Sequence, residues 1–527
     1  MQLLLELPEI SPALANVVET NPKKLRDWLI GLPSSNVIEA GRQIHDALAS
    51  LNRIELAIDD RIKLLAEYET MLDLMAGGFE AEYAAAGLPV KEHAKQAAAI
   101  YRSLWLEMAM AWKVVLVNRM EKRSLFGVNG KAEPLFIQRV LNSYWRVYRI
   151  CCRLYQPMPS GVWGEIHQMF RLGAKNQFLN EPATPKNHSI SATYKRILLL
   201  ALADPLRFAP PEQDKVVEIV ESYSYLAHFQ PTASLTSQAG YFLIELDTDT
   251  PPRFVGNRTI EGTNLTSVLL DTTELSRHLH KTEAAIEEKA PLAHDRAKVL
   301  VRLQILRRII RQWTITPQRT FQRIPSSSLV DIVFGLRSVL TELSHGQILN
   351  PPQTSTPPEH HDEQETILPP PSREVRRTQW QVLNESPGGF AVHSVSVGDE
   401  QVHAGDVVAL RATLDSPWLV ASVRWLQVNE DNSLEMGLQV MSARAVPALI
   451  SPTIGATPNY LPAVLLPEIA ALKQPARIAA SKGTYTPLRE LSILTATGMH
   501  KVRASKLVEQ QMSYDLFDYQ TDQPIHV

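Results

Sequence analysis

A proline-rich segment in the second half of the chain restricts the possible folds more than any other feature. Residues 346–372 contain Pro351-Pro352, Pro357-Pro358 and Pro369-Pro370-Pro371 among polar and acidic residues. This composition cannot bury an apolar core and favours extended chain, so it predicts a linker. The chain has 527 residues, which is too long for one ordinary core, and we expect about three domains.

The sequence before this segment has mostly helical periodicity. Asn21-Pro22 has the pattern of a helix N-cap followed by proline, and Gly31 is placed to end that helix. The run from Tyr194 to Ala203 is nearly all apolar after a basic start, which predicts a helix that is buried on most sides. We therefore predict an all-α helical array over residues 1–230, either an α-solenoid or an irregular bundle.

Residues 231–345 have a mixed character. Tyr241–Leu246 and Thr266–Leu270 have the pattern of strands, and helices are predicted at about 291–313 and 326–345. We predict a β insert with helices that continue the helical domain. Alternatively, the two strands belong to a β-domain that follows later in the chain.

Two short polar motifs follow the proline-rich segment: an R-x-x-x-R run and an N-x-S-x-G-G loop. Arginine has a planar donor fork that pairs with phosphate oxygens and with the O6/N7 edge of guanine. Asparagine and serine place short polar groups on a turn, and glycine permits close approach of a ligand to the backbone. The candidate ligand-binding residues are Arg373, Arg376, Arg377, Asn384, Ser386, Gly388 and Gly389.

The motif pair and the strands after it resemble PilZ domains, which are small β-barrels that bind the bacterial second messenger cyclic di-GMP. The resemblance covers residues 373–445, and it implies an all-β PilZ-like barrel whose motif residues hold cyclic di-GMP as a ligand, with no other cofactor. The strand-like runs that carry it are Phe390–Val392, Val402–Leu410, Trp418–Leu426 and Glu435–Val440.

The helical part also resembles a known group of proteins. Four stretches are similar to the long helical N-terminal regions of large PilZ-containing proteins of β- and γ-proteobacteria. They are Trp28–Pro33, Leu48–Arg53, Trp163–His167 and Tyr194–Pro205.

The spacing of the two motifs departs from the PilZ pattern. The family usually has a strand pair between them, whereas this chain has only the strand-like piece 378–383. Either the barrel lacks its opening strand or another segment supplies it. The alternative to ligand binding is a PilZ-like barrel with basic residues at its mouth and no nucleotide.

The remaining sequence limits the choice of function. Residues 446–527 alternate like short strands and predict a small C-terminal β-rich unit. A formal net charge of −3 argues against a general nucleic-acid binder. No apolar run is long enough to span a bilayer and the N-terminus does not resemble a signal peptide, so we expect a cytoplasmic protein without a membrane span.

Other polar groups are better explained by structure than by chemistry. Cys151-Cys152 lie in an apolar stretch and predict buried thiols, and the Glu165-Ile-His167 pair predicts a helix with a hydrogen-bonded histidine. His360-His361-Asp362 lie in the proline-rich segment, where solvated side chains are expected and a metal site is not. The arginines at 302–311 predict a solvated face paired with acids. No catalytic signature is present, so we do not predict an enzyme.

Two functions remain. The first is a cyclic di-GMP receptor whose barrel binds the ligand and relays binding to a protein partner through the helical domain. The alternative is a non-binding PilZ-like scaffold or adaptor that acts only in protein–protein interaction.

Overall fold

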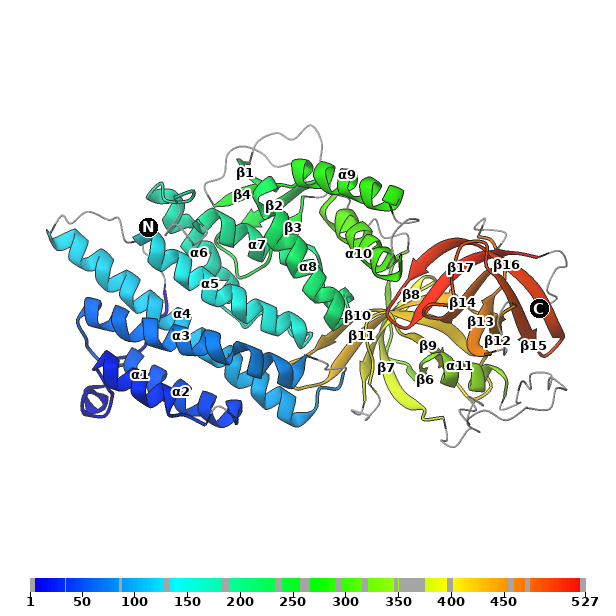
Figure 1. Cartoon of the computed structure of the whole chain (residues 1–527), viewed down its shortest axis with the longest axis horizontal. Coiled ribbons are helices and arrows are strands. Elements are labelled where there is room, and N and C mark those ends of the chain that lie inside the picture. The colour runs from blue at the N-terminus through cyan, green and yellow to red at the C-terminus, as the bar shows by residue number, and fades with distance from the viewer. Residues whose placement is uncertain are drawn as a thin grey trace, which may run out of the picture.

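The structure is a computed structural model that consists of a helical body followed by two β-barrels (Figure 1). Arg373 of the first motif and His360, His361 and Asp362 lie outside the residues that it describes. The described residues are 5–33, 35–84, 88–126, 133–181, 189–232, 239–255, 266–289, 296–314, 321–345, 349, 375–395, 401–453, 459–469 and 474–521.

The predicted helical array is present. Asn21 caps the first helix, because its side-chain oxygen accepts hydrogen bonds from the backbone N–H groups of Lys23 and Lys24 at 3.0 and 3.2 Å. The helices of this body are α1 (Pro22–Ile30), α2 (Val37–Asn52), α3 (Ile58–Tyr83), α4 (Glu92–Phe126), α5 (Glu133–Arg153), α6 (Val162–Lys175), α7 (Ile190–Leu202) and α8 (Pro210–Tyr223). Three short 3-10 helices accompany them among the described residues, η1 (Pro12–Asn16), η2 (Pro205–Arg207) and η3 (Ser224–Leu226).

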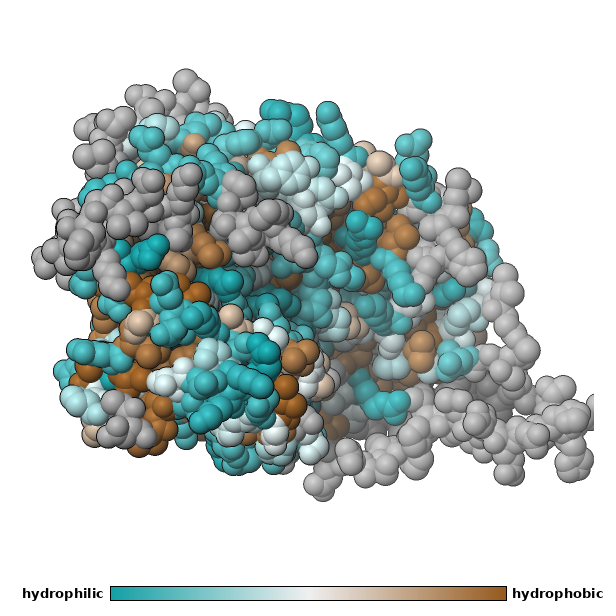
Figure 2. Space-filling view, turned by 60° about the vertical axis from the view of Figure 1, so that its left-hand side comes forward, coloured by the Kyte–Doolittle hydropathy of each residue, from teal (hydrophilic) through white to brown (hydrophobic). Residues whose placement is uncertain are grey.

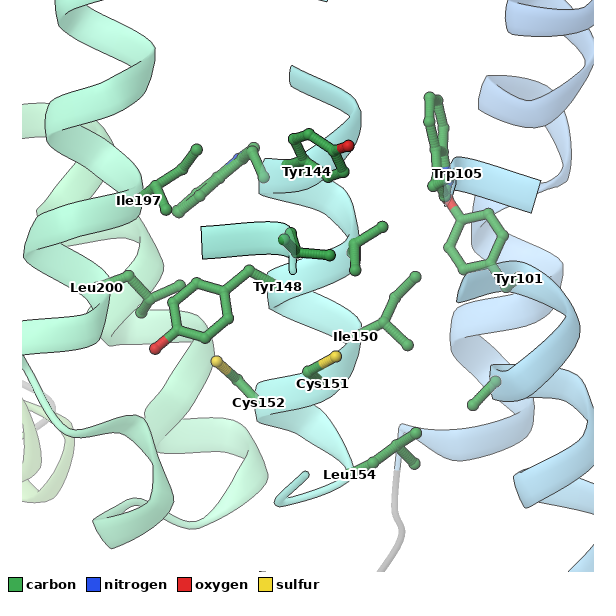
Figure 3. Packing of buried hydrophobic residues seen from close by; sticks show 14 of the residues in the cluster. Tyr101, Trp105, Tyr144, Tyr148, Ile150, Cys151, Cys152, Leu154, Ile197 and Leu200 are labelled. Atoms are coloured by element: carbon green, nitrogen blue, oxygen red, sulfur yellow. The ribbon is translucent and has the colours of Figure 1, made fainter. Parts of the chain in front are cut away.

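The two cysteines are part of the helical core, as predicted. Figure 3 shows Cys151 and Cys152 on α5 among apolar side chains that include Tyr148 and Leu200. Both thiols are free, and they are 0% and 4% exposed. Burial raises the pKa of both thiols above the ordinary value, which favours the protonated form in the folded chain.

A small sheet and two helices follow α8 and cover one side of the helical body (Figure 1). The strands pair in the order β1-β4-β2-β3, and none of them joins a barrel. The strand pair predicted at 241–270 is therefore an insert with a sheet of its own. These elements are β1 (His228–Pro231), β2 (Tyr241–Glu245), β3 (Arg253–Phe254), β4 (Ser267–Asp271), α9 (Thr273–Lys289) and α10 (Arg296–Thr314).

The first barrel is a sheet ordered β5-β7-β6-β9-β10-β11-β8 that closes through the pairing of β7 with β8. Its opening strands come from before the proline-rich segment. The strands are β5 (Ile324–Pro325), β6 (Leu329–Phe334), β7 (Thr378–Ser386), β8 (Gly389–Ser394), β9 (Val407–Arg411), β10 (Leu419–Val428) and β11 (Leu434–Ser442).

The helix predicted at 326–345 is wrong in its first half. Residues Leu329–Phe334 form β6, and only Leu336–Leu343 are helical, as α11. The run Leu-Val-Asp-Ile-Val-Phe is rich in β-branched side chains, and its strand pairs with β7 on one side and β9 on the other. The predicted start of the barrel at residue 373 is therefore too late. It excludes β5, β6 and α11, although these elements help to build the barrel.

The C-terminal β unit is a second closed barrel, ordered β12-β13-β14-β17-β16-β15. Ala448, Ile478, Ile493 and Phe517 are among the side chains that fill it. Its strands are β12 (Val446–Pro452), β13 (Leu461–Leu466), β14 (Arg477–Ser481), β15 (Glu490–Thr495), β16 (Gly498–Gln510) and β17 (Tyr514–Gln520).

The helical body and the first barrel share one hydrophobic core. Buried side chains of the helices and of β6, β7, β8, β10 and β11 form a single cluster. Backbone hydrogen bonds also cross this boundary, since Leu88 and Val402 pair through both of their N–H groups at 3.1 and 2.8 Å. The N–H of Val428 donates to the carbonyl of Tyr155 at 2.8 Å, at the end of the β10–β11 hairpin that reaches the helices in Figure 1.

Candidate ligand site at the β7–β8 hairpin

The N-x-S-x-G-G motif forms the turn of the β7–β8 hairpin. Asn384 pairs with Ala391, and Ser386 pairs with Gly389 across the turn. The Ser386 hydroxyl donates a hydrogen bond of 3.3 Å to the carbonyl of Gly389. The structure thus places Asn384 and Ser386 on the same partly exposed turn as Gly388 and Gly389.

Close packing requires glycine at position 389 and leaves little room for a side chain at position 388. A Cβ at Gly389 would lie 2.0 Å from the carbonyl oxygen of Leu438 on β11. A Cβ at Gly388 would lie 3.2 Å from the Phe321 ring, and the Gly388 carbonyl accepts a hydrogen bond from the Val440 N–H at 3.1 Å. The glycines therefore let the turn approach β11 and the segment that contains Phe321.

The side chain of Asn384 remains available for a ligand. It makes no hydrogen bond to any residue that the structure describes, although its backbone lies in the pairing of β5, β7 and β8. An amide offers two donors and one acceptor, so it is able to recognise either a base edge or a phosphate oxygen.

The arginines that follow the proline-rich segment lie elsewhere. Arg377 precedes the first residue of β7, and Ser386 is the last residue of that nine-residue strand. An extended strand rises about 3.3 Å per residue, so the two are separated by roughly 30 Å along the strand. The structure therefore does not bring Arg377 to the Asn384–Gly389 turn.

Arg377 is also committed to another partner. Its Nε and Nη2 donate to the two carboxylate oxygens of Glu342 on α11 at 2.8 and 3.0 Å. The hydrogen bond to Glu342 raises the pKa of Arg377 above its ordinary value. Arg376 is exposed and has an interaction of its own, so the described members of this run are not free cations.

A different arginine lies beside the turn. Ile324 pairs with Glu385 and Pro325 pairs with Asn384, so the chain just before β5 runs antiparallel along the motif. Arg323 is the next residue, directly ahead of this pairing, and it is exposed. Among the described residues it has no hydrogen bond and no ion pair. Its guanidinium is therefore available at the turn, in contrast to that of Arg377.

Sequence reasoning missed Arg323 even though a signal was present. Arg319-Thr-Phe-Gln-Arg323 is a second R-x-x-x-R run, and Ile324-Pro325 follows it as the start of a strand. The helix predicted at 326–345 separates this run from the predicted barrel, whereas in the structure β5 and β6 are barrel strands. Arg319 itself lies outside the described residues.

Glu165 and His167 are structural, as the sequence predicted. The ring nitrogens of His167 lie 2.8 Å from the Tyr194 hydroxyl and 2.9 Å from the Thr250 carbonyl. Lys113 donates to both oxygens of Glu165 at 2.6 and 2.8 Å. These contacts satisfy both groups inside the helical body.

The arginines of α10 are partly paired with acids. The Arg307 side chain binds Glu283 at 2.7 Å and Glu287 at 2.8 Å, and Arg308 binds Glu212 at 3.0 Å. Within the parts of the chain that the structure describes, no group of three or more metal-ligating side chains occurs. No described helix combines the length and the apolar character that a bilayer crossing requires.

Comparison with known proteins gives matches along nearly the whole chain. Residues 23–233 match "Cyclic-di-GMP receptor FimW, N-terminal domain", and residues 448–522 match "FimW C-terminal beta-barrel domain". Residues 241–366 and 343–447 match "Cyclic-di-GMP receptor FimW, middle PilZ domain". A relative from Pseudomonas aeruginosa, named Cyclic-di-GMP receptor FimW, is 23% identical over 99% of this chain and 94% of its own length. Because three domains of one family match in order, the chain belongs to the FimW family of PilZ-domain proteins.

Proposed function

We propose that this protein is a cyclic di-GMP receptor and that the ligand binds at the β7–β8 turn together with Arg323. The observation that carries the proposal is the pairing of Ile324-Pro325 with Asn384-Glu385, which places a free guanidinium beside the N-x-S-x-G-G turn. The relative from Pseudomonas aeruginosa is named as a receptor for the same ligand.

Each group has a role that suits its chemistry. Arg323 binds a phosphate or the O6/N7 edge of a guanine through its planar fork. Asn384 and Ser386 supply short polar contacts from the turn, and Gly388 and Gly389 allow the ligand to approach the backbone. The alternative is the binding role that the sequence motif predicts for Arg373, Arg376 and Arg377, and the variant Arg377→Ala tests it.

In our proposal the helical body transmits ligand binding from the barrel to a protein partner. The first barrel and the helices share one core, so a change at the barrel has a packed route to the helices. Apolar side chains are exposed on the helical body, among them Trp28, Ile30 and Leu74. Figure 2, which turns this end toward the viewer, shows apolar residues between polar ones. We propose that this body binds a protein partner in the cytoplasm and performs no catalysis.

Isothermal titration calorimetry with cyclic di-GMP tests the ligand site. Loss of a charge-assisted contact costs about 1.5–3 kcal/mol, so Arg323→Ala should weaken binding about tenfold or more. Ser386→Ala should weaken it less, because a hydroxyl contact is neutral. Arg377→Ala is the matched control and should bind like the wild type.

Two results would contradict the proposal in different ways. If Arg377→Ala loses affinity and Arg323→Ala does not, the arginines after the proline-rich segment form the site. If the wild type gives no heat and no competition at tens of micromolar ligand, the non-binding adaptor function is the correct one.

Hydrogen exchange tests the relay. We expect ligand to slow exchange at the turn and also at the amides of Val402 and Val428, which bond to the helical body. If bound ligand slows exchange at the turn but not at Val402 and Val428, the protein binds the ligand but does not relay binding through these contacts.

A further inference from the structure

A wide cavity lies between α11, the first barrel and the connection to the second barrel. Its volume is about 1000 Å³, which is at the upper end of the range for small-molecule sites. Three arginines line it, Arg377 ahead of β7, Arg411 at the end of β9 and Arg444 after β11. Neither the β7–β8 turn nor Arg323 lines this cavity.

Arg411 is the deepest of the three and is incompletely bonded. It is 9% exposed, and its guanidinium carbon lies 4.5 Å from the centre of the Trp418 ring. Its Nη1 donates to the Leu414 carbonyl at 3.3 Å, and its Nε lies 3.6 Å from the carboxylate of Asp331. Nε and Nη2 have no hydrogen-bond partner among the described residues.

Such a guanidinium is costly without a further partner. A buried charged group without hydrogen bonds has lost its hydration and has no protein partner to replace it, which is unfavourable. Native proteins therefore provide hydrogen-bond partners for nearly all buried polar groups. Asp331 offsets part of the charge but is beyond hydrogen-bond distance of Nε. Stacking on Trp418 holds the guanidinium in place, and both of its unpaired nitrogens are covered by protein atoms.

The acids at the cavity do not supply that acceptor. Glu342 is engaged by Arg377 through both of its oxygens. Asp415 lines the cavity, but it is exposed and makes no ion pair with the described residues. Arg444 is exposed, and its guanidinium has no hydrogen bond or ion pair within the described residues. Two arginines at one cavity therefore have donor groups without acceptors.

We propose that this cavity binds a small phosphate-bearing molecule, with the phosphate held by the guanidinium groups of Arg411 and Arg444. Two guanidinium groups, one at the end of β9 and one in the connection after β11, match an oxyanion that has several acceptor oxygens. The site is separate from the one at the β7–β8 turn. It therefore gives the protein an anionic ligand in addition to the one that the turn recognises.

Inorganic phosphate is the probe for this site. We would measure the melting temperature of the full-length protein in sodium phosphate and in sodium chloride of equal ionic strength. Phosphate should give an additional stabilisation of the wild type, which increases with concentration and saturates. Arg444→Ala should lose it, and Arg411→Lys should need at least about tenfold more phosphate, because an ammonium lacks the fork.

Arg337→Ala is the matched control. Arg337 is an exposed arginine of α11 that does not line the cavity, so this variant should respond to phosphate like the wild type. The same measurement at saturating cyclic di-GMP should leave the phosphate response intact.

Three outcomes would overturn the proposal. The first is no specific response of the wild type to phosphate. The second is an equal response of the wild type, Arg444→Ala and Arg337→Ala. The third is a phosphate response that saturating cyclic di-GMP abolishes, because the two ligands would then share one site. If Arg411→Lys fails to fold, the phosphate response of Arg444→Ala, at the exposed rim of the cavity, still tests the proposal.

Discussion

Gly389 on β8 lies directly against the carbonyl of Leu438 on β11, where a Cβ would be 2.0 Å from the oxygen. The obstacle is backbone, which cannot turn away as a flexible side chain can. The same glycine ends the N-x-S-x-G-G turn, so one residue sets both the closure of the barrel and the position of the candidate ligand site.

Gly389→Ala should therefore destabilise the barrel and weaken ligand binding together. Forcing an extra methyl into a tight contact typically costs about 1–3 kcal/mol, which urea denaturation followed by tryptophan fluorescence would measure. Gly388→Ala is the comparison, since its Cβ would meet only the edge of the Phe321 ring at 3.2 Å. It should lose less stability, and equal losses in both variants would contradict this account.

Acid should loosen the contact between the barrels through Glu509. Arg424 on β10 donates from Nη2 to Glu509 on β16 at 2.9 Å, and a second, shorter hydrogen bond joins the pair. Burial alone would raise the pKa of Glu509, but the hydrogen bonds and charge of Arg424 outweigh it, and the pKa is lowered. The unfolded chain then binds this proton more readily than the folded one. The stabilisation is complete above the unfolded pKa of about 4.3 and is lost as the pH falls through the folded pKa.

Denaturation between pH 6 and pH 3 would test this. Glu509→Gln should be less stable near neutral pH by roughly 1–3 kcal/mol, and its stability should change less with acid than that of the wild type. Glu490→Gln is the control, because the Glu490–Arg503 pair is more than half exposed. If the stability of Glu509→Gln depends on pH as steeply as that of the wild type, the Arg424–Glu509 pair does not contribute to the acid sensitivity.

His167 should make the helical body sensitive to mild acid. Burial lowers the pKa of His167 despite the favourable hydrogen bond to the Thr250 carbonyl. The unfolded histidine, with a pKa of about 6.5, binds a proton that the folded one resists. Stability is therefore complete above about pH 6.5 and decreases below it, by at most about 1.4 kcal/mol per pH unit. His167→Gln should flatten this dependence between pH 7 and 5.5, whereas a substitution of the exposed His228 should not.

The two thiols should report global unfolding. Both are buried and have raised pKa values, so a thiol reagent at pH 8 should react with the native protein only through opening of the core. In concentrated urea two thiols per chain should react at once. Rapid reaction of either thiol in the native protein would show that α5 is less well packed than described here.

The limit of the helical body can be tested with two fragments. Residues 1–314 end with α10, whereas residues 1–345 also carry β6, whose buried Val330, Ile332 and Val333 would lose the later strands that pack on them in the whole chain. The longer fragment should expose an unpaired apolar strand, bind more of a hydrophobic dye and self-associate. Size-exclusion chromatography would reveal this. A longer fragment that is better behaved than the shorter one would contradict the assignment of β6 to the barrel.

Sequence patterns predicted the elements whose partners are local. Asn21 and the apolar run before Asp204 identified helices, and the alternation around Trp425 and Met436 identified strands, because capping and periodicity act within a few residues. The pairing of Ile324 with Glu385 was not predictable in this way. It joins residues separated by the proline-rich segment, and nothing within either stretch specifies the other.

Only the turn of the candidate site was predictable in this way. Asn384, Ser386, Gly388 and Gly389 lie on one turn, because their spacing is that of a hairpin. The arginine half could not be chosen from sequence alone, since two R-x-x-x-R runs exist and only the strand order brings Arg323 to the turn. Glu342 on α11 pairs with Arg377, and the helix predicted at 326–345 contains all of α11 but wrongly includes β6.

The pairing of β6 with β7 means that a cut in the proline-rich segment would divide the first barrel between two polypeptides. The N-terminal piece would carry β5 and β6, and the C-terminal piece would carry β7 and the later strands. The ladders β6–β7 and β6–β9 would still join the pieces without a covalent bond. Such a nicked protein should remain associated, and the separate pieces should complement each other when mixed. Lengthening the segment should also cost little, because each doubling of a loop adds only about 0.6 kcal/mol of closure entropy.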